Sequence, residues 1–233
     1  VAQASFIAAE IQAKYKDYNS ETIRGLMIHS AEWTEKMKNR FIKTGKKAEY
    51  SKLLRFFGYG VPNLSKAIKC SNNSVNMIIE DEIQPYVKGK SNIKIKEMNL
   101  HKLPWPKEVL LNLGAEIVKM KVTLSYFIEP LPGERGWKDK YKYASCNLRF
   151  EVNNSDENEE DFKKRINKLM RENDDDKGNG SSGSDRWTLG KNNRCSGSVH
   201  SDTWEGTAAD LSQSNYIAVY PTSGWWKEKD KLE

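Results

Sequence analysis

Apolar and small side chains recur at intervals of three and four residues at the start of the chain. Within residues 2–15 these positions are Ala4, Ile7, Ala8, Ile11 and Tyr15. This spacing is typical of a helix with one buried face. After a polar turn at residues 16–19, Ser20 is a suitable N-cap for a second helix, with apolar positions at Ile23, Leu26, Met27 and Ala31. The pattern predicts two helices joined by a short turn.

The next stretch, residues 35–52, is dominated by charged side chains and contains Gly45. It predicts a loop or a weak helix. Residues 56–60 read Phe-Phe-Gly-Tyr-Gly, which is the composition of a tight turn. Pro62 ends this turn, and a short helix is expected at residues 64–68.

The residue pattern changes after Cys70, where runs of β-branched and aromatic residues alternate with turn residues. The runs are 75–79, 93–100, 117–128, 147–152 and 216–220. In the longest run, one set of alternate positions is apolar and the other polar: Val118, Met120, Val122, Leu124 and Tyr126 against Lys119, Lys121, Thr123 and Ser125. This alternation predicts a strand with one face in the core and a wetter opposite face. The series predicts an antiparallel β-sandwich of jelly-roll type.

A polar stretch at about residues 153–185 interrupts the series of strands. It is first acidic, then basic, and then contains three consecutive aspartates at 174–176 followed by Gly and Ser. We interpret it as an insertion in which a helix over residues 159–172 precedes a flexible tether. With helices at the start and strands after them, the predicted fold class is α+β.

Composition narrows the possible partners. The 38 basic and 32 acidic residues are mixed along most of the chain, so the net charge of +6 predicts no nucleic-acid partner. No apolar run reaches the roughly 18 to 20 residues of a membrane span, so no membrane partner is expected. Cys70, Cys146 and Cys195 lie far apart and outside metal-binding spacings, which favours buried thiols in a reducing compartment such as the cytoplasm. The acidic clusters lack the pattern of a calcium loop, and we predict no cofactor.

The candidates for acid–base chemistry are the histidines, because imidazole titrates near neutrality. His29 is expected to be a packed or polar helix residue, and His101 lies near a Pro-Trp-Pro turn that would bury its indole. Residues 198–202 contain Ser198, His200, Ser201 and Asp202, all three residue types of a catalytic triad. A triad needs side chains that converge from separate elements, so we expect these four to alternate along one strand. The prediction is therefore no catalytic, cofactor-binding or metal-binding residue in this chain.

Large aromatic side chains are frequent in the second part of the chain. They are Trp137, Trp187, Trp204, Trp225, Trp226, Tyr141, Tyr143, Tyr216 and Tyr220. We expect most of them to be core and rim residues. The alternative is a recognition face beside polar loops such as residues 132–136, which would make the chain a non-enzymatic module that binds protein or carbohydrate.

The order and spacing of the first elements resemble a segment of the subtilisin-like serine peptidases, the subtilases. In that family a Gly-Thr-Ser-x-Ala nucleophile motif is followed by an alanine-rich buried helix, a short turn, and a second helix with an arginine and a small final residue. Residues 2–15, 16–19, Arg24 and Ala31 correspond to these features. The run at 57–63, Phe-Gly-Tyr-Gly-Val-Pro-Asn, followed by Ala67, is similar to the family's Gly-x-Gly-x-x-(Asn/Asp)-x-x-x-Ala signature. The Pro-His that usually follows the serine is replaced by Ala2 and Gln3.

The resemblance implies a C-terminal part of a serine endopeptidase that begins just after the nucleophilic serine. The serine would head the first helix about three residues before Val1, with the catalytic Asp and His and the oxyanion-hole Asn farther upstream. The chain alone is therefore expected to be inactive, and its partner would be a protein or peptide substrate bound through the upstream part. Residues 1–70 would complete the catalytic domain, and residues 71–233 would form a β-sandwich with the insertion at about 153–185. The strand order and the segment 126–137 are similar to C-terminal domains of bacterial subtilases.

Overall fold

The computed structural model describes residues 2–69, 76–89, 93–130, 144–172 and 186–228. The chain forms two compact units, each built from segments that are distant in the sequence. The first unit combines Val1–Glu80, Ile117–Ser125 and Ser182–Gly206, and the second combines Asp81–Glu116, Tyr126–Ser181 and Thr207–Glu233. Helices and antiparallel sheets both occur, so the predicted α+β class is confirmed.

Three helices of the first unit share one core. They are α1 (Ala2–Lys14), α2 (Ser20–Ser30) and α5 (Leu64–Lys69). Their buried side chains are Ile7, Ile11, Ile23, Leu26 and Ala67. The predicted pair of helices and the short third helix are therefore confirmed. Ala4 was predicted to face this core but is exposed, because the cluster contacts only the middle and end of α1.

The charged stretch that predicted a loop or weak helix is two helices, α3 (Glu35–Phe41) and α4 (Lys47–Phe57). Thr34 caps α3 by accepting a hydrogen bond from the Met37 amide at 3.3 Å. Between the helices, the Glu49 carboxylate accepts the amides of Lys43, Thr44 and Gly45 at 3.0–3.1 Å, and these donors lower the pKa of Glu49 to about 2. Many of the charged residues in this stretch are good helix formers. The helix pattern was hard to recognise because Leu53 is the one buried residue of α4.

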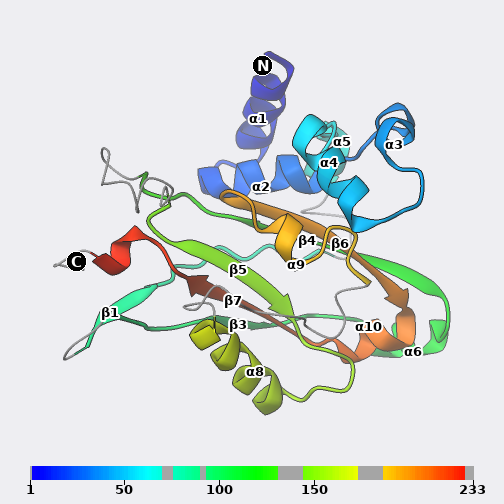
Figure 1. The fold of residues 1–233 in the computed structure, drawn as a ribbon. Helices are drawn as coiled ribbons and strands as arrows, with labels where there is room; N and C mark the ends of the chain where they lie inside the picture. Colours follow the sequence, from blue (N-terminus) through cyan, green and yellow to red (C-terminus); the bar gives the residue numbers. More distant parts are fainter. Residues whose placement is uncertain (1, 70–75, 90–92, 131–143, 173–185, 229–233) are drawn as a thin grey trace. The chain divides into compact units, whose positions relative to one another are not determined.

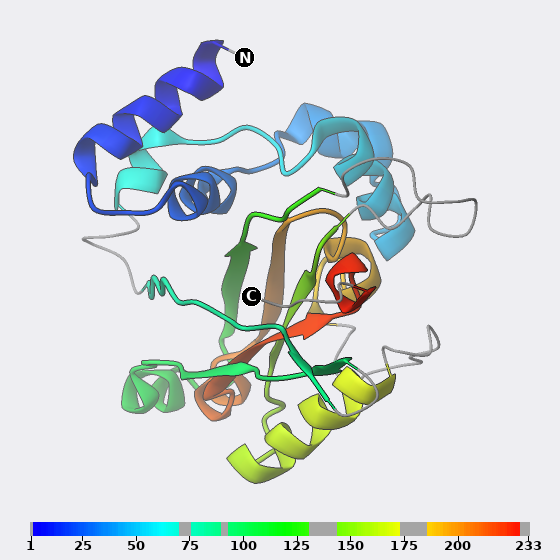
Figure 2. The same cartoon turned by 90° about the vertical axis from the view of Figure 1, so that its left-hand side faces the viewer.

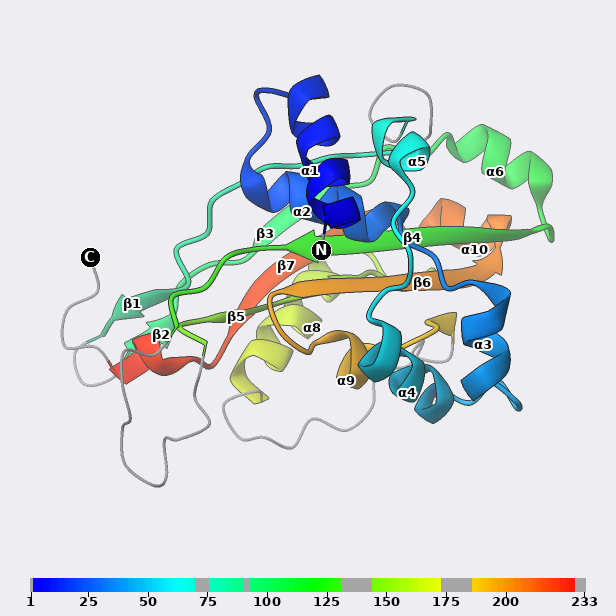
Figure 3. The same cartoon turned by 90° about the horizontal axis from the view of Figure 1, so that it is seen from above.

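The first unit also contains a two-stranded sheet of β4 (Ile117–Ser125) and β6 (Val199–Thr207). The strands run in opposite directions (Figure 3), as the partners Lys119 with Glu205 and Thr123 with Ser201 require. The helix α9 (Lys191–Arg194) precedes β6. The strand β6 was not among the five β-rich runs, because its first half is polar, but His200, Ser201 and Asp202 do lie along it, as predicted for the triad-type residues.

The polar face of β4 is the wetter of its two faces, as the alternation predicted, but most of it is covered by the fold. Lys121, Thr123 and Ser125 are all partly buried, because α2 packs against this strand. Each of the three side chains makes a polar contact with α2. The polar positions of β4 therefore mark a second interface rather than a solvent face.

In the second unit, β7 (Tyr216–Thr222) is the central strand of an antiparallel sheet between β3 (Asn99–Lys102) and β5 (Asn147–Val152). A separate antiparallel pair is formed by β1 (Tyr86–Lys88) and β2 (Ile93–Ile95). The remaining elements of this unit are α6 (Lys107–Leu113), α8 (Glu159–Glu172), α10 (Ala208–Gln213) and the 3-10 helix η2 (Trp225–Glu228).

Most of the predicted β runs contain strands. The runs at 117–128, 147–152 and 216–220 hold β4, β5 and β7, and the run at 93–100 holds β2 and the start of β3. The run at 75–79 was wrongly predicted, since its described residues 76–79 form no strand. Ile78 instead packs against the helical core of the first unit, so its apolar character serves a helix cluster and not a sheet.

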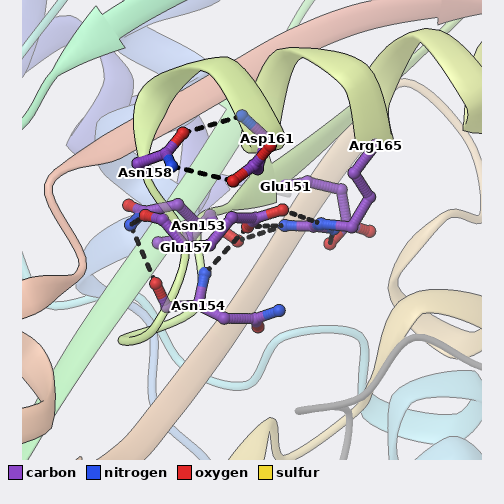
Figure 4. A network of polar contacts seen from close by, with 8 residues as sticks. Glu151, Asn153, Asn154, Glu157, Asn158, Asp161 and Arg165 are labelled. Atoms are coloured by element: carbon purple, nitrogen blue, oxygen red, sulfur yellow. Dashed lines mark hydrogen bonds and ion pairs between the residues drawn. The ribbon is translucent and has the colours of Figure 1, made fainter.

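The helix predicted within the insertion is confirmed as α8, which lies along the β3–β7–β5 sheet (Figure 1). Phe162 and Ile166 are fully buried against Ala218 and Tyr220 of β7. Asn158 begins the helix: its Oδ1 accepts the Asp161 amide at 2.9 Å, and its Nδ2 donates to the Asp161 carboxylate at 2.8 Å (Figure 4). The tether predicted to follow α8 lies outside the described residues.

A polar network fixes the start of α8 to the end of β5 (Figure 4). Arg165 donates from Nε and one terminal nitrogen to the two oxygens of Glu157, at 2.8 and 2.9 Å, and to the Val152 carbonyl at 3.1 Å. Asn153 is buried and bridges β5 to β7, because its Oδ1 accepts the Tyr216 amide at 2.7 Å. The charged groups of this network are mutually satisfied, which indicates a structural role.

Candidate functional site

The interface between α2 and the β4–β6 sheet holds a group of polar side chains that are hydrogen-bonded to one another and to the backbone. Lys121 of β4 lies at the C-terminal end of α2 and donates to the carbonyls of Ile28, His29 and Ala31 at 3.3, 2.7 and 2.8 Å. Carbonyls at a helix end lack partners within the helix and carry partial negative charge. The ammonium group of Lys121 therefore stabilises the end of α2 and connects it to the sheet.

Next to Lys121, three side chains form a chain of hydrogen bonds across the interface. His29 Nδ1 lies 3.0 Å from Thr123 Oγ1, and Thr123 Oγ1 lies 2.8 Å from Ser201 Oγ. Burial, together with the positive charge of Lys121, lowers the pKa of His29 to about 4. His29 is therefore a neutral imidazole at physiological pH.

Tyr59, from the turn after α4, hydrogen-bonds to β6 next to this series of side chains. Its hydroxyl donates to the Val199 carbonyl at 2.8 Å and accepts the Ser201 amide at 3.2 Å. Burial raises the pKa of Tyr59, so the hydroxyl stays protonated and can fill both roles. The glycine–aromatic turn thus binds directly to β6, 140 residues away in the sequence.

Nearer the start of α2, Arg24 connects the helix to the sheet region, as Lys121 does at its end. Its Nε donates to Ser125 Oγ at 3.0 Å, and a terminal nitrogen donates to the Ser198 carbonyl at 3.1 Å. The arginine that matched the family pattern by its place in the second helix therefore connects α2 to β4 and to the residue just before β6.

Asp202 lies in a second, fully buried polar group on β6. Its carboxylate accepts the amides of Leu189, Gly190 and Thr203, each at 2.9 Å. Arg194 of α9 lies 3.6 Å from the same carboxylate, and its guanidinium covers the ring of Trp187 at 4.7 Å. Burial raises the pKa of Asp202, while the amide donors and Arg194 oppose that rise. Asp202 therefore organises the loop before α9.

The four triad-type residues at 198–202 do not converge on one another. Ser201 binds Thr123 and Asp202 binds backbone amides, whereas His200 Nε2 lies 2.9 Å from the Gly197 carbonyl. Ser201 is 2% exposed, so a substrate could not reach its hydroxyl. Sequence reasoning missed Thr123 and Tyr59, and the polar positions within the alternation of β4 were the signal that could have indicated Thr123. The contacts of these residues join secondary structure elements.

The other histidine and the aromatic residues singled out from the sequence also make contacts within the fold. His101 of β3 lies 3.8 Å from Asp81, and the indole of Trp105 donates to the Ser214 carbonyl at 2.7 Å. Three aromatic side chains of the proposed recognition face, Trp187, Trp204 and Trp225, are buried, as is Tyr220. Trp137, Tyr141, Tyr143 and the loop 132–136 lie outside the described residues.

The cysteines and acidic groups suggest no further chemistry. Cys146 is a buried thiol, and burial raises its pKa to about 11; the Cys195 thiol is partly buried. Cys70 lies outside the described residues. In the described part of the chain, no group of His, Cys, Asp and Glu side chains could hold a metal ion, and no helix there is long and apolar enough to cross a membrane.

The partly buried His29 predicts a loss of stability in mild acid. Its pKa is about 4 in the folded chain and about 6.5 in the unfolded chain. The unfolded state therefore binds more protons between these values, and stability should fall as the pH falls through this window. From pH 7 to pH 5, His29 should account for about 2 kcal/mol of lost unfolding free energy.

Urea unfolding of the wild type and of His29→Gln at several pH values measures this contribution. The glutamine can still hydrogen-bond Thr123 but does not titrate, so its loss of stability between the two pH values should be smaller by about 2 kcal/mol. Equal pH dependence in the two proteins would contradict a buried neutral imidazole.

The chain matches no protein-family model, no curated protein and no solved structure.

Proposed function

We propose that this chain is the C-terminal part of a subtilisin-like serine endopeptidase and that α1 is the helix headed by the nucleophilic serine. The observation that carries the proposal is that α1 is apolar on two opposite sides. One side, with Ile7 and Ile11, is buried in the core of the first unit. The opposite side carries Ala2, Phe6, Ala9 and Ala13, all exposed.

The exposed stripe follows helical spacing, at intervals of four, three and four residues. Phe6, in the middle of this stripe, is 56% exposed. Figure 2 shows α1, in dark blue, with one side free along its length. A helix with apolar side chains on opposite faces is typical of the interior of a larger domain. In the proposed enzyme, the stripe packs against the part of the catalytic domain that precedes α1 in the sequence.

The signature after α4 also supports the proposal. Gly60 has a positive φ of 97° and lies against the backbone of Glu32, where Glu32 and Val61 pair as an isolated antiparallel bridge. Only glycine fits this conformation and this close approach. Ala67, the last residue of the signature, is fully buried in the α1–α2–α5 core. Both small residues of the motif thus have a packing reason to be small.

The proposed chemistry is peptide-bond hydrolysis by residues upstream of this chain. A serine attacks the substrate carbonyl, a histidine transfers the proton, and an aspartate orients the histidine. The residues described here position the serine, since α1 rests on α2, and Arg24 and Lys121 fix α2 to the β4–β6 sheet. The proposal includes the finer architecture, with a catalytic part ending at about residue 70 and an appended sandwich of jelly-roll type.

The coding sequence upstream of Val1 and a fluorophosphonate probe together test this proposal. We expect an open frame with a Gly-Thr-Ser-x-Ala motif whose serine lies about three residues before Val1. The extended protein should be labelled at that serine, and the 233-residue chain should be labelled no more than a denatured control. An upstream frame without the motif, or stoichiometric labelling of Ser198 or Ser201, would overturn the proposal.

A substitution in the exposed stripe tests the role of α1 separately. Ala9→Arg should abolish folding or labelling of the extended protein, because a charge would enter its core, at a cost of several kcal/mol. In the 233-residue chain the same change should alter stability by less than about 0.5 kcal/mol. Gln12→Arg, at an exposed position on another side of α1, is the matched control and should have little effect in either protein.

A further inference from the structure

The net charge of the chain is concentrated in one pair of helices. Residues 35–57, which contain α3 and α4, hold 8 Lys or Arg and 2 Glu. Their net charge of +6 equals that of the whole chain, so the other 210 residues are balanced at 30 basic and 30 acidic side chains. We call residues 35–57 the basic hairpin. Its charge is local and not a property of the overall composition.

The basic side chains and one phenyl ring share the outer surface of the basic hairpin. On α4, Lys52, Arg55 and Phe56 are exposed, and their spacing of three and four residues places them on one side of the helix. On α3, Lys36 and Arg40 are exposed one turn apart. The two helices lie side by side (Figure 3). The hairpin therefore presents cations on both helices.

Phe56 is 68% exposed, the most exposed of the large apolar side chains in the described residues. Its ring stacks on Phe41 with centroids 4.9 Å apart, and Phe57 meets Phe41 edge-on at 5.8 Å. The Arg40 guanidinium lies over the Phe41 ring, 5.7 Å from its centroid. The exposed ring is thus held in place by neighbours that belong to the same hairpin.

The acidic side chains of the basic hairpin do not neutralise this surface. Glu49 is used by the three backbone amides of the turn, and Glu35 pairs with Lys38. Within the described parts of the chain, no ion pair involves the six exposed cations Lys36, Arg40, Lys43, Lys46, Lys52 and Arg55. A surface with uncompensated charge of one sign attracts a ligand of the opposite sign.

We propose that the basic hairpin binds an acidic polypeptide segment that carries an apolar side chain next to its carboxylates. Arg55 and Lys52 would bind the carboxylates by charge-assisted hydrogen bonds, and Phe56 would cover the apolar side chain. This interaction does not depend on the peptidase assignment, because every residue involved is present in the chain described here.

Two other polyanions fit the surface less well. Proteins that bind single-stranded nucleic acid offer aromatic rings to successive bases, whereas the basic hairpin exposes one large ring, and a duplex would leave that ring against a charged backbone. A helix that binds a membrane surface buries a whole apolar face in the lipid. The apolar side of α4 is already occupied by the fold through Leu53. A polypeptide supplies carboxylates and an isolated apolar group together.

Fluorescence anisotropy with a labelled peptide of Glu-Glu-Phe repeats tests the proposal on the 233-residue chain. Binding should be saturable and should weaken about tenfold or more between about 50 and about 300 mM salt. The double variant Lys52→Gln/Arg55→Gln should weaken binding about tenfold. Lys36→Gln/Arg40→Gln provides a second, independent variant on the other helix with the same direction of effect. Phe56→Ala should weaken binding of this peptide but not of a Glu-Glu-Ser repeat.

The matched control is Lys14→Gln/Lys16→Gln, which removes the same charge from exposed positions outside the basic hairpin. It should change the affinity by less than about twofold. Circular dichroism of each variant verifies that it is folded. The proposal is overturned if this control weakens binding as much as the hairpin variants, or if a Gln-Gln-Phe peptide binds equally well. Tighter binding to an oligothymidylate or to phosphatidylserine vesicles would also reject it, in favour of a nucleic acid or a membrane.

Discussion

Asp202→Ala should lower the free energy of unfolding by about 3–5 kcal/mol, the largest effect we expect from a single side chain of the first unit. The substitution leaves the buried guanidinium of Arg194 without its carboxylate, which lies 3.6 Å away in the wild type. It also removes the acceptor of the amides of Leu189, Gly190 and Thr203. Because these groups are shielded from water, solvent cannot replace the lost partner.

Urea unfolding followed by circular dichroism measures this change. Glu205→Ala is the matched control, since Glu205 is an acidic residue of the same strand with a side chain that is 52% exposed and pairs with Lys119. The control should cost less than about 1 kcal/mol, as is usual for exposed ion pairs. Similar losses in the two variants would show that the Asp202 group does not stabilise the loop before α9 in the way described.

Gly60→Ala should destabilise the chain by about 3 kcal/mol or more. A side chain at this position must adopt a φ near 97°, and its Cβ would lie 2.3 Å from the Glu32 carbonyl oxygen. The left-handed conformation costs about 1–3 kcal/mol, and relief of the overlap requires displacement of the bridge between Glu32 and Val61. The turn that positions Tyr59 against β6 would shift with it.

Gly58→Ala separates the two causes, because Gly58 also has a positive φ, of 56°, while a Cβ there would meet no described atom within 4 Å. This variant bears the conformational cost alone, about 1–3 kcal/mol, because the φ of 56° and ψ of −141° at Gly58 are rarely adopted by residues with a side chain. We expect the thermal and urea midpoints to follow the order wild type, Gly58→Ala, Gly60→Ala. A Gly60→Ala protein as stable as Gly58→Ala would exclude the close approach to Glu32 as a determinant.

Several elements could be predicted because their residues interact with near neighbours in the sequence. The helix α8 was predicted with its observed bounds, Glu159–Glu172, within a stretch that is first acidic and then basic. The strand β5 was predicted with its observed bounds, Asn147–Val152, as a run of strand-forming residues between turns. In contrast, the charged residues of α3 and α4 concealed two helices, since helix propensity outweighed the scarcity of buried positions.

The polar interface was beyond prediction for a different reason. Alternation along β4 correctly separated its apolar side chains from its polar ones, but it could not specify what covers the polar face. Only the fold brings α2 onto this face, where His29 lies beside Lys121 and its pKa falls to about 4. Likewise, the mixed charge along the chain suggested no polyanion surface, until the structure placed the excess on the outside of two adjacent helices.

The sequence by itself determined the helical hairpin at the start, the places of most strands and the small residues Gly60 and Ala67 that close packing requires. These features depend on local periodicity and backbone conformation, which are properties of neighbouring residues. The tertiary structure alone decided that Ser198, His200, Ser201 and Asp202 bind separate partners, and that the second apolar side of α1 is exposed. Burial and hydrogen-bond partners arise from contacts between distant segments, and one-dimensional spacing does not encode which segments meet.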